Sequence, residues 1–385
     1  MLNIAQADEV LRSFPQADKL TYHGIKPSNH SQKELNTAVI TFYEHWKKKY
    51  LVESSKVPGD YKIAYNKRKE TVSEAMGYGM LVVVQMAGYD PKAKAYFDGL
   101  NRFRKRYPSI VNKVFMNWKV KEENPKADDC ATDGDIDMAT ALLMAEQQWG
   151  DKTYLEEAKL IIKNIGTDLV RKDYSLRLGD WNTDAGKHAG TRPSDFATAH
   201  FRAFYEATGD QRWQKVENKC YSIIAQLQRD HSPGVGLVPD FAVWDAKGNW
   251  KPASPKFLEG KDDGNYSYNS CRVPWRIGLS AVYHEDPRAR KVMARLMKWV
   301  VETHSKPKSV RAGYSLDGKA LVKYDEPVFT SPIAVAAMST DDQKWLDATF
   351  DYVREYKTDY FSDSVNMLSM LVLTGNYWLP NYESK

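Results

Sequence analysis

One junction, repeated along the chain, constrains the fold more than any other feature. It consists of an apolar helix end, a tight turn and an aspartate that opens the next helical segment, as in TGDQRWQKVENK. The aspartates at these junctions are Asp90, Asp151, Asp210, Asp286 and Asp342, which lie 61, 59, 76 and 56 residues apart. Two helices of ordinary length fill each interval, so the pattern predicts about six helical hairpins.

The segments between the junctions have the periodicity of helices. Ser31 and Glu34 form a capping box, and apolar residues follow at spacings of three and four. Similar patterns occur at 76–87, 136–149, 155–169 and 293–301, whereas alternating strand patterns are scarce. We therefore predict an all-α chain whose hairpins close into an (α/α)6 barrel.

No linker rich in proline or serine divides the chain, so residues 1–385 are predicted to form a single domain. The long insertions at 172–192 and 240–269 are expected to be loops at one end of the barrel, where binding residues usually gather.

Composition excludes several classes of partner. The net charge of +5 comes from lysines and arginines scattered among 50 acidic residues, which argues against nucleic acid as a partner. No apolar run approaches the ~20 residues that a membrane span needs. Neither a cofactor motif nor a metal motif is visible, and we expect a monomer. Cys130, Cys220 and Cys271 are interpreted as buried thiols, with one disulfide as the alternative.

The aromatic content is unusual for a chain of this length. The 11 tryptophans and 23 tyrosines have the apolar body and polar tip that suit contact with sugar rings, although a large helical core would also use them.

Two segments carry the candidate chemistry. ATDGDIDMATALLMAEQQW places Asp133, Asp135 and Asp137 at the start of a helix, where one is expected to cap it and the others to line a polar cleft or bind a metal. Calcium is the weaker interpretation, because the glycine and glutamate of an EF-hand loop are missing. TVSEAMGYGM places Glu74 at another helix start. We interpret its glycines as permitting close approach of a ligand; the alternative for Glu74 is a simple helix-dipole interaction.

Together these segments resemble glycoside hydrolase family 8, whose signature matches residues 131–149. The likeness extends to IKPSNHSQKELN, to TRPSDFATAHFRAFYEATGD and to the closing YFSDSVNMLSMLVLTGNYW. The resemblance implies that Glu74 is the general acid and that Asp133 positions the sugar at subsite −1. It further implies a secreted enzyme, although the first residues, MLNIAQADEV, do not have the pattern of a signal peptide.

The chain departs from most of the family at the general base. The segment YSYNSCRVPWRIG has Asn269 where an aspartate is usual, and an amide cannot accept a proton from water. The site could be inactive, engineered or relocated. The sequence is similar to a chitosanase and lichenase subgroup in which a glutamate of the preceding insertion is the base. This implies Glu259 as the base, with Asp262 and Asp263 as reserves.

The resemblance implies endo-acting hydrolysis of β-1,4 bonds with inversion, in which Glu74 and Glu259 act on opposite faces of the sugar. A second departure, Ala75 and Met76 beside Glu74, leaves the substrate open. We expect chitosan, because Asp180, Asp184 and Asp195 would make the cleft acidic, although the net charge opposes this. The alternatives are an endo-β-glucanase acting on lichenan or cellulose, and a non-catalytic polysaccharide-binding barrel. The predicted substrate-binding residues are Tyr78, Trp118, Asp135, Trp181, Asp195, Asn269 and Arg272.

Overall fold

The computed structural model describes residues 9–382. The very start of the chain, on which the question of a signal peptide depends, lies outside the described residues.

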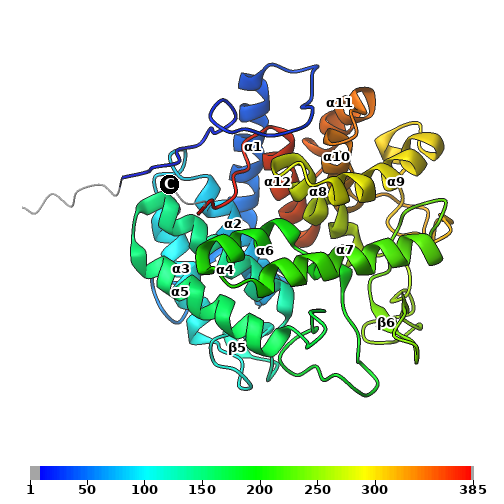
Figure 1. Ribbon diagram of the computed structural model, residues 1–385. Helices are drawn as coiled ribbons and strands as arrows, with labels where there is room; N and C mark the ends of the chain where they lie inside the picture. The colour runs from blue at the N-terminus through cyan, green and yellow to red at the C-terminus, as the bar shows by residue number, and fades with distance from the viewer. Residues whose placement is uncertain (1–8, 383–385) are drawn as a thin grey trace, which may run out of the picture.

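An inner ring of helices forms the centre of the molecule (Figure 1). Each inner helix contacts the next along the chain, and the last packs against the first, which closes the ring. The inner helices are α2 (Ser73–Gln85), α4 (Thr132–Trp149), α6 (Thr198–Thr208), α8 (Val273–Tyr283), α10 (Pro327–Met338) and α12 (Tyr360–Leu373).

An outer ring surrounds the inner one. α1 packs on α12, and α3, α5, α7, α9 and α11 each pack on the inner helix that precedes them. The outer helices are α1 (Gln32–Tyr50), α3 (Ala93–Arg106), α5 (Lys152–Asn164), α7 (Arg212–Asp230), α9 (Pro287–Thr303) and α11 (Gln343–Val353). Residues 9–382 thus contain six pairs of helices in an (α/α)6 barrel, as predicted.

The two rings differ in their apolar pattern for a simple reason. An inner helix is covered on every side, and α10 is buried along its whole length. An outer helix faces water on one side and buries only a stripe, which in α1 includes Leu35, Val39, Phe42 and Trp46. The predicted capping box of Ser31 and Glu34 is present at the start of α1.

The junction aspartates satisfy backbone N–H groups in two ways. Asp151 and Asp286 are the N-caps of α5 and α9, and their side chains accept bonds from the first turn. Asp90 lies two residues before the N-cap of α3 and Asp210 lies one residue before the N-cap of α7; each accepts from the N–H two residues further on. Asp342 is the N-cap of α11, but its side chain makes no capping bond.

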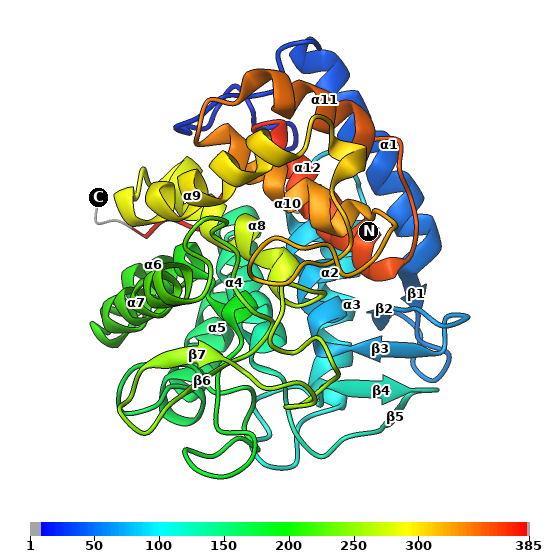
Figure 2. The same ribbon diagram turned by 90° about the vertical axis from the view of Figure 1, so that its right-hand side faces the viewer.

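Short strands and short helices occur in the connections between the long helices. The strands β1 (Leu51–Glu53) and β2 (Tyr61–Ile63) form one antiparallel pair, and β6 (Ala242–Trp244) and β7 (Trp250–Pro252) form another. A three-stranded antiparallel sheet contains β3 (Glu70–Val72), β4 (Lys119–Lys121) and β5 (Asn124–Pro125). The short helices are η1 (Ile165–Leu169), η2 (Pro193–Asp195), η3 (Ser270–Arg272) and η4 (Pro307–Ser309). Loops and strands cross in front of the inner helices in Figure 2.

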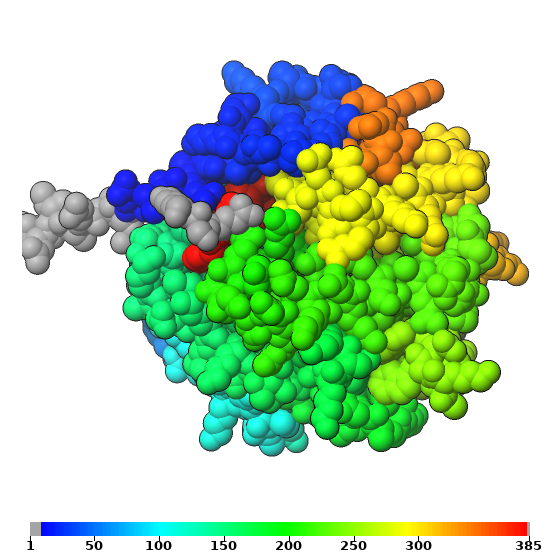
Figure 3. Space-filling model, in the orientation of Figure 1, coloured from blue at the N-terminus to red at the C-terminus, as the bar shows by residue number. Residues whose placement is uncertain are grey.

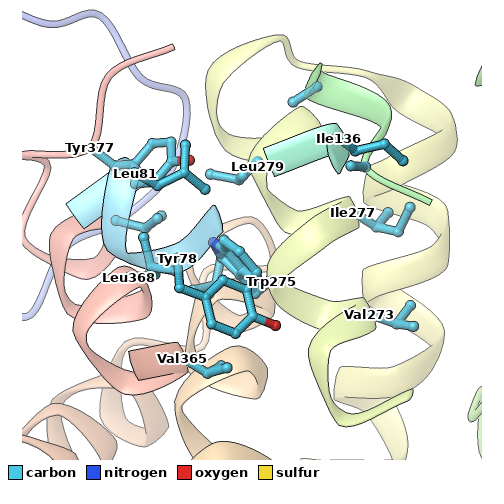
Figure 4. Close-up of a cluster of buried hydrophobic side chains, with 14 of the residues drawn as sticks. Tyr78, Leu81, Ile136, Val273, Trp275, Ile277, Leu279, Val365, Leu368 and Tyr377 are labelled. Carbon is cyan, nitrogen blue, oxygen red and sulfur yellow. The ribbon is translucent and has the colours of Figure 1, made fainter. Parts of the chain in front are cut away.

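A continuous apolar core lies between the inner helices. Tyr78 of α2 packs edge to face against Trp275 of α8, with ring centroids 6.0 Å apart. Val365 and Leu368 of α12 lie beside them (Figure 4). The three cysteines are buried and free, as the thiol interpretation predicted. Across the described part of the chain, no helix has both the length and the apolarity needed to cross a membrane.

Glycine allows α2 and α4 to pack unusually close. A Cβ at Gly77 would lie 2.7 Å from the Cβ of Asp137, and one at Gly134 would lie 2.6 Å from the backbone of Ser73. The expectation that the glycines near Glu74 admit a ligand is therefore wrong for Gly77, whose space is taken by α4. This close packing places the start of α2 directly beside the start of α4.

Candidate active site

Glu74 lies in the first turn of α2. The other residues of this helix are buried, whereas the side chain of Glu74 is 17% exposed. Its Oε2 accepts a hydrogen bond of 2.8 Å from Nη1 of Arg272, and its Oε1 lies 3.5 Å from the hydroxyl of Tyr360. Burial raises the pKa of Glu74 to about 7; the Arg272 charge opposes this rise and the Asp133 charge adds to it. A carboxyl in this environment retains its proton near neutral pH.

Asp133 lies at the start of α4 and is almost completely buried. Its Oδ2 accepts from Nη1 of Arg272 at 2.7 Å, and its Oδ1 lies 2.8 Å from Nη2 of Arg192. Burial works against its ionisation, yet Arg192 and Arg272 together hold the pKa of Asp133 well below its usual range. At neutral pH Asp133 is therefore ionised while a large fraction of Glu74 is protonated, although the two groups share one arginine.

Arg272, in η3, connects the carboxyl groups of Glu74 and Asp133 to Asn269. It is fully buried and donates to side chains from four separate segments of the chain, which fixes its orientation. These side chains belong to Glu74, Tyr78, Asp133, Ser194 and Asn269. Its contacts in this structure are all within the protein, so it organises the carboxyl groups around it.

Asn269 connects this arginine to Glu259. Its Oδ1 accepts from Nη2 of Arg272 at 2.9 Å, and its Nδ2 donates to Oε2 of Glu259 at 2.8 Å. Glu259 itself is exposed. A continuous series of hydrogen bonds thus runs from Glu74 through Arg272 and Asn269 to Glu259, and the two glutamates do not contact each other.

Two buried aspartates hold the loop that carries Glu259 and Asn269. Asp263 accepts from the backbone N–H groups of residues 258, 259 and 260 at 2.7, 3.0 and 2.8 Å. Asp240 accepts from the N–H groups of residues 267, 269 and 270. Burial raises the pKa of Asp240 to about 7, although these hydrogen bonds oppose the rise. Asp263 therefore supports Glu259, and its three backbone bonds leave it poorly placed as the reserve base.

A cavity of about 460 Å³ opens beside these groups. Trp118 and Trp181 line it together with Arg192 and Glu259. Trp118 is 39% exposed, and its carbonyl accepts the N–H of Ser73, the residue before Glu74. The two tryptophans predicted as sugar platforms thus share one cavity with Glu259, and Trp118 also contacts the start of α2, where Glu74 lies.

Comparisons with known proteins identify the family to which this arrangement belongs. The model described as glycosyl hydrolases family 8 matches residues 31–375. The chain belongs to glycoside hydrolase family 8. It is therefore an enzyme that hydrolyses glycosidic bonds.

Individual relatives of this family-8 chain match over nearly its whole length. A β-glucanase from Niallia circulans is 40% identical over 376 residues, covering 95% of this chain and 91% of that protein. An endoglucanase from Bacillus sp. strain KSM-330 is 38% identical, covering 97% of this chain and 83% of that protein. The apo structure of a β-1,3-1,4-glucanase from Paenibacillus sp. X4 superposes with a TM-score of 0.92 at 39% identity, covering 96% of this chain and 99% of that one.

Three predicted binding residues lie away from the cavity of this family-8 enzyme. Tyr78 is fully buried against Trp275, so no sugar can stack on it in this structure. Asp135 is fully buried and accepts the N–H of Met116; burial raises its pKa well above the usual range. Asp195 is buried too and pairs with Arg192 at 2.8 Å. Tyr78 and Asp195 instead contact the arginines of the site, and Asp135 holds the backbone of Met116.

The aspartates at the start of α4 do not act as expected. The N-cap of α4 is Ala131, and no side chain caps the helix. Asp137, fully buried, forms two hydrogen bonds with Arg276. Among residues 9–382, no group of three or more His, Cys, Asp or Glu side chains could hold a metal ion. Asp133 and Asp137 bind arginines and Asp135 binds a backbone N–H, and these structural roles replace the capping and metal interpretations.

The acidic loop residues on which the chitosan prediction depended are also occupied. Asp180 accepts from the Ser109 hydroxyl and from the N–H of Cys130. Asp184 pairs with Arg171 and Arg177 at 3.1 and 2.8 Å. Asp184 and Asp195 are thus paired with arginines, whereas the donors to Asp180 are uncharged and leave its negative charge in place.

Sequence reasoning missed Arg192, Tyr360 and the two loop-supporting aspartates, Asp240 and Asp263, in their present roles. Arg192 precedes Asp195 by three residues in the segment TRPSD, and Tyr360 opens the segment YFSDSVNM. Both segments are among those that resemble the family, but the sequence gives no sign that Arg192 lies between Asp133 and Asp195.

Proposed function

We propose that this family-8 enzyme is an endo-acting β-glucanase that cleaves β-1,4 bonds with inversion of configuration. The observation that carries the proposal is the hydrogen-bonded series from Glu74 through Arg272 and Asn269 to Glu259. Inverting hydrolysis needs a protonated and an ionised carboxyl group about 6.5 to 9.5 Å apart, with room for a water molecule. Two glutamates that belong to one hydrogen-bonded series without contacting each other are consistent with a mechanism that uses two separate carboxyl groups.

Glu74 is the general acid in this proposal. Its pKa of about 7 lets it enter the reaction protonated and donate its proton to the glycosidic oxygen as the bond breaks. The leaving chain then departs with a new hydroxyl group. Nearby Tyr360 and Arg272 fix the direction of the carboxyl group.

Glu259 is the general base. Its carboxylate takes a proton from the water that attacks the opposite face of the sugar, and the oxygen of that water forms the new bond to the anomeric carbon. Asn269 orients Glu259 by donating to Oε2. We therefore propose that the asparagine belongs to a relocated site, as in the subgroup with a glutamate base. The role of Asp133 at subsite −1 stays a prediction, because its carboxylate contacts arginines in this structure.

Glucan is favoured over chitosan as the substrate on two grounds. The relatives at 38–40% identity are named β-glucanase and endoglucanase, and two of the three acidic residues that suggested a cationic polymer, Asp184 and Asp195, are paired with arginines. Trp118 and Trp181 provide neutral platforms beside Glu259. We take a mixed-linkage β-1,3-1,4-glucan as the first substrate to test, and we propose that the enzyme acts on this polymer outside the cell.

A reducing-sugar assay across mixed-linkage β-glucan, carboxymethylcellulose, chitosan and xylan tests the substrate. We expect the highest kcat/KM on a β-glucan, and NMR should show the α-anomer as the first product. Faster hydrolysis of chitosan would overturn the substrate, and an initial β-anomer would overturn the role of Glu259. Binding without release of reducing ends on any polymer would instead support the non-catalytic barrel.

A further inference from the structure

A second groove lies outside the catalytic cavity, on the loops formed by the two long insertions. The strand pair β6 and β7 carries Trp244 opposite Trp250. The surface of this segment, yellow-green in Figure 3, lies beside the green surface of the preceding chain. Trp244 borders two adjoining hollows of about 270 and 540 Å³, and Asp184 lies on the rim of both.

The indole of Trp244 is held rigidly while part of it stays exposed. Trp250 packs against it edge to face, with ring centroids 5.2 Å apart. The Arg171 guanidinium lies 5.2 Å from its ring centroid and is itself fixed by Asn182 and by the carbonyl of Gly190. A fixed, partly exposed indole binds with little loss of conformational entropy.

Polar groups that suit sugar hydroxyls surround this indole. Asp173 pairs with Lys219 and Asp184 with Arg171 and Arg177, yet the two carboxylates keep 50% and 54% of their side chains exposed. Lys187 and Lys251 lie on the rim of the larger hollow. An aromatic face flanked by carboxylates and ammonium groups offers both acceptors and donors to a neutral polyhydroxylated ring.

The groove is linked to the catalytic cavity by a line of packed rings. Phe257, which borders the larger hollow, packs on His188, and His188 packs on Trp181 of the cavity. The next residues after Phe257 are Leu258 and Glu259, which line the cavity itself. A polymer long enough to leave the cavity over this edge would therefore reach Trp244.

We infer that the Trp244 groove is an accessory binding site for a strand of neutral β-glucan. The inference deepens the proposed function and rests on it for the identity of the polymer. The groove holds the chain away from the bond that is cut, so it affects polymers and leaves short oligosaccharides unaffected. The lysines of the rim make an acidic polysaccharide the competing ligand, and the test separates the two.

Affinity electrophoresis through gels that contain soluble mixed-linkage β-glucan measures the site directly. All variants carry Glu74→Gln, so that the polymer is not consumed. We expect Trp244→Ala to weaken retention about fivefold, as the loss of roughly 40 Å² of apolar contact predicts. Trp244→Phe should weaken it less. Leu160→Ala, at a residue 52% exposed on α5, is the matched control and should not change retention.

Further measurements keep the test decisive. Ala185→Arg, at the exposed rim, should block the groove without removing the indole, and it should also reduce retention. It therefore tests the site independently if Trp244→Ala does not fold. With Glu74 intact, Trp244→Ala should keep its kcat on a soluble tetrasaccharide.

Unchanged retention in both Trp244→Ala and Ala185→Arg would overturn the accessory site. Retention that is stronger on carboxymethylcellulose than on mixed-linkage β-glucan, and that disappears at high salt, would show that the groove binds an acidic polymer and would overturn the assignment of a neutral ligand. Failure of the wild type to hydrolyse any β-glucan would refute the proposed function alone, because retention is measured without turnover.

Discussion

Replacing Asp133 by asparagine should move the pH dependence of the reaction. Glu74 and Asp133 bind the same nitrogen of Arg272, at 2.8 and 2.7 Å. Two charges about 5 Å apart interact by about 3 kcal/mol at an effective dielectric constant of about 20. This corresponds to about two pKa units. Without the Asp133 charge, the pKa of Glu74 should fall from about 7 toward about 5.

The consequence for the rate follows from the protonated fraction of Glu74. At pH 7 about half of the wild-type Glu74 carries its proton, whereas in Asp133→Asn only about one molecule in a hundred would. The rate at pH 7 should therefore fall about fiftyfold from this cause alone, and much of it should return at pH 5.

The assay is the pH profile of kcat on a soluble β-glucan, with thermal unfolding as the control for folding. The descending limb of the profile should lie near pH 7 in the wild type and close to pH 5 in Asp133→Asn. A limb that stays in place while kcat falls equally at every pH would refute the electrostatic argument. Asp133 would then act by direct contact with the substrate.

Glu74→Gln should lower kcat by about 10²- to 10⁴-fold with folding intact, and retention of a tenth of the wild-type rate would exclude Glu74 as the acid. Glu259→Ala should abolish hydrolysis, and added azide should restore cleavage with a glycosyl azide as product; no rescue would argue against Glu259 as the base. Asp263→Asn should reduce kcat about tenfold at nearly unchanged KM, because it weakens the charge-assisted bonds that position Glu259, whereas a change confined to KM would contradict that role. Gly77→Ala should lower the free energy of unfolding by about 1–3 kcal/mol, since its Cβ would lie 2.7 Å from Asp137, and a Tm at or above the wild-type value would show that α2 and α4 separate freely.

The barrel could be predicted from the sequence because the signals that start and end its helices lie within a few residues of one another. Helix starts such as the Ser31 capping box, and the aspartates at the junctions, depend on residues a few positions apart. The closing contact between α12 and α2 was inferred only from the number of hairpins. The start of α4 shows where local information fails. One of its three aspartates was expected to cap the helix, but all three bind arginines or backbone groups that are distant in sequence.

The site was predictable to the extent that it followed the family resemblance. Glu74, Asn269 and Glu259 were named from it, and the structure brings them into one hydrogen-bonded series. Arg192 and Asp263 could not be assigned roles, because their partners are fixed by the packing of separate segments. Tyr78 was misassigned for the same reason: a tyrosine one helical turn after the proposed general acid can point into the core.

The close packing of α2 on α4 divides the catalytic machinery into two parts with different tolerance to change. Glu74 and Asp133 belong to the rigid barrel, where even one methyl group at Gly77 or Gly134 has no space. Glu259 belongs to an exposed loop attached through Asp263. The position of Glu259, the proposed proton acceptor, can thus be altered by remodelling a loop, while Glu74, the proposed proton donor, keeps its place. Directed evolution of this enzyme toward new polymers would accordingly find its accepted substitutions on the loop side of the cleft.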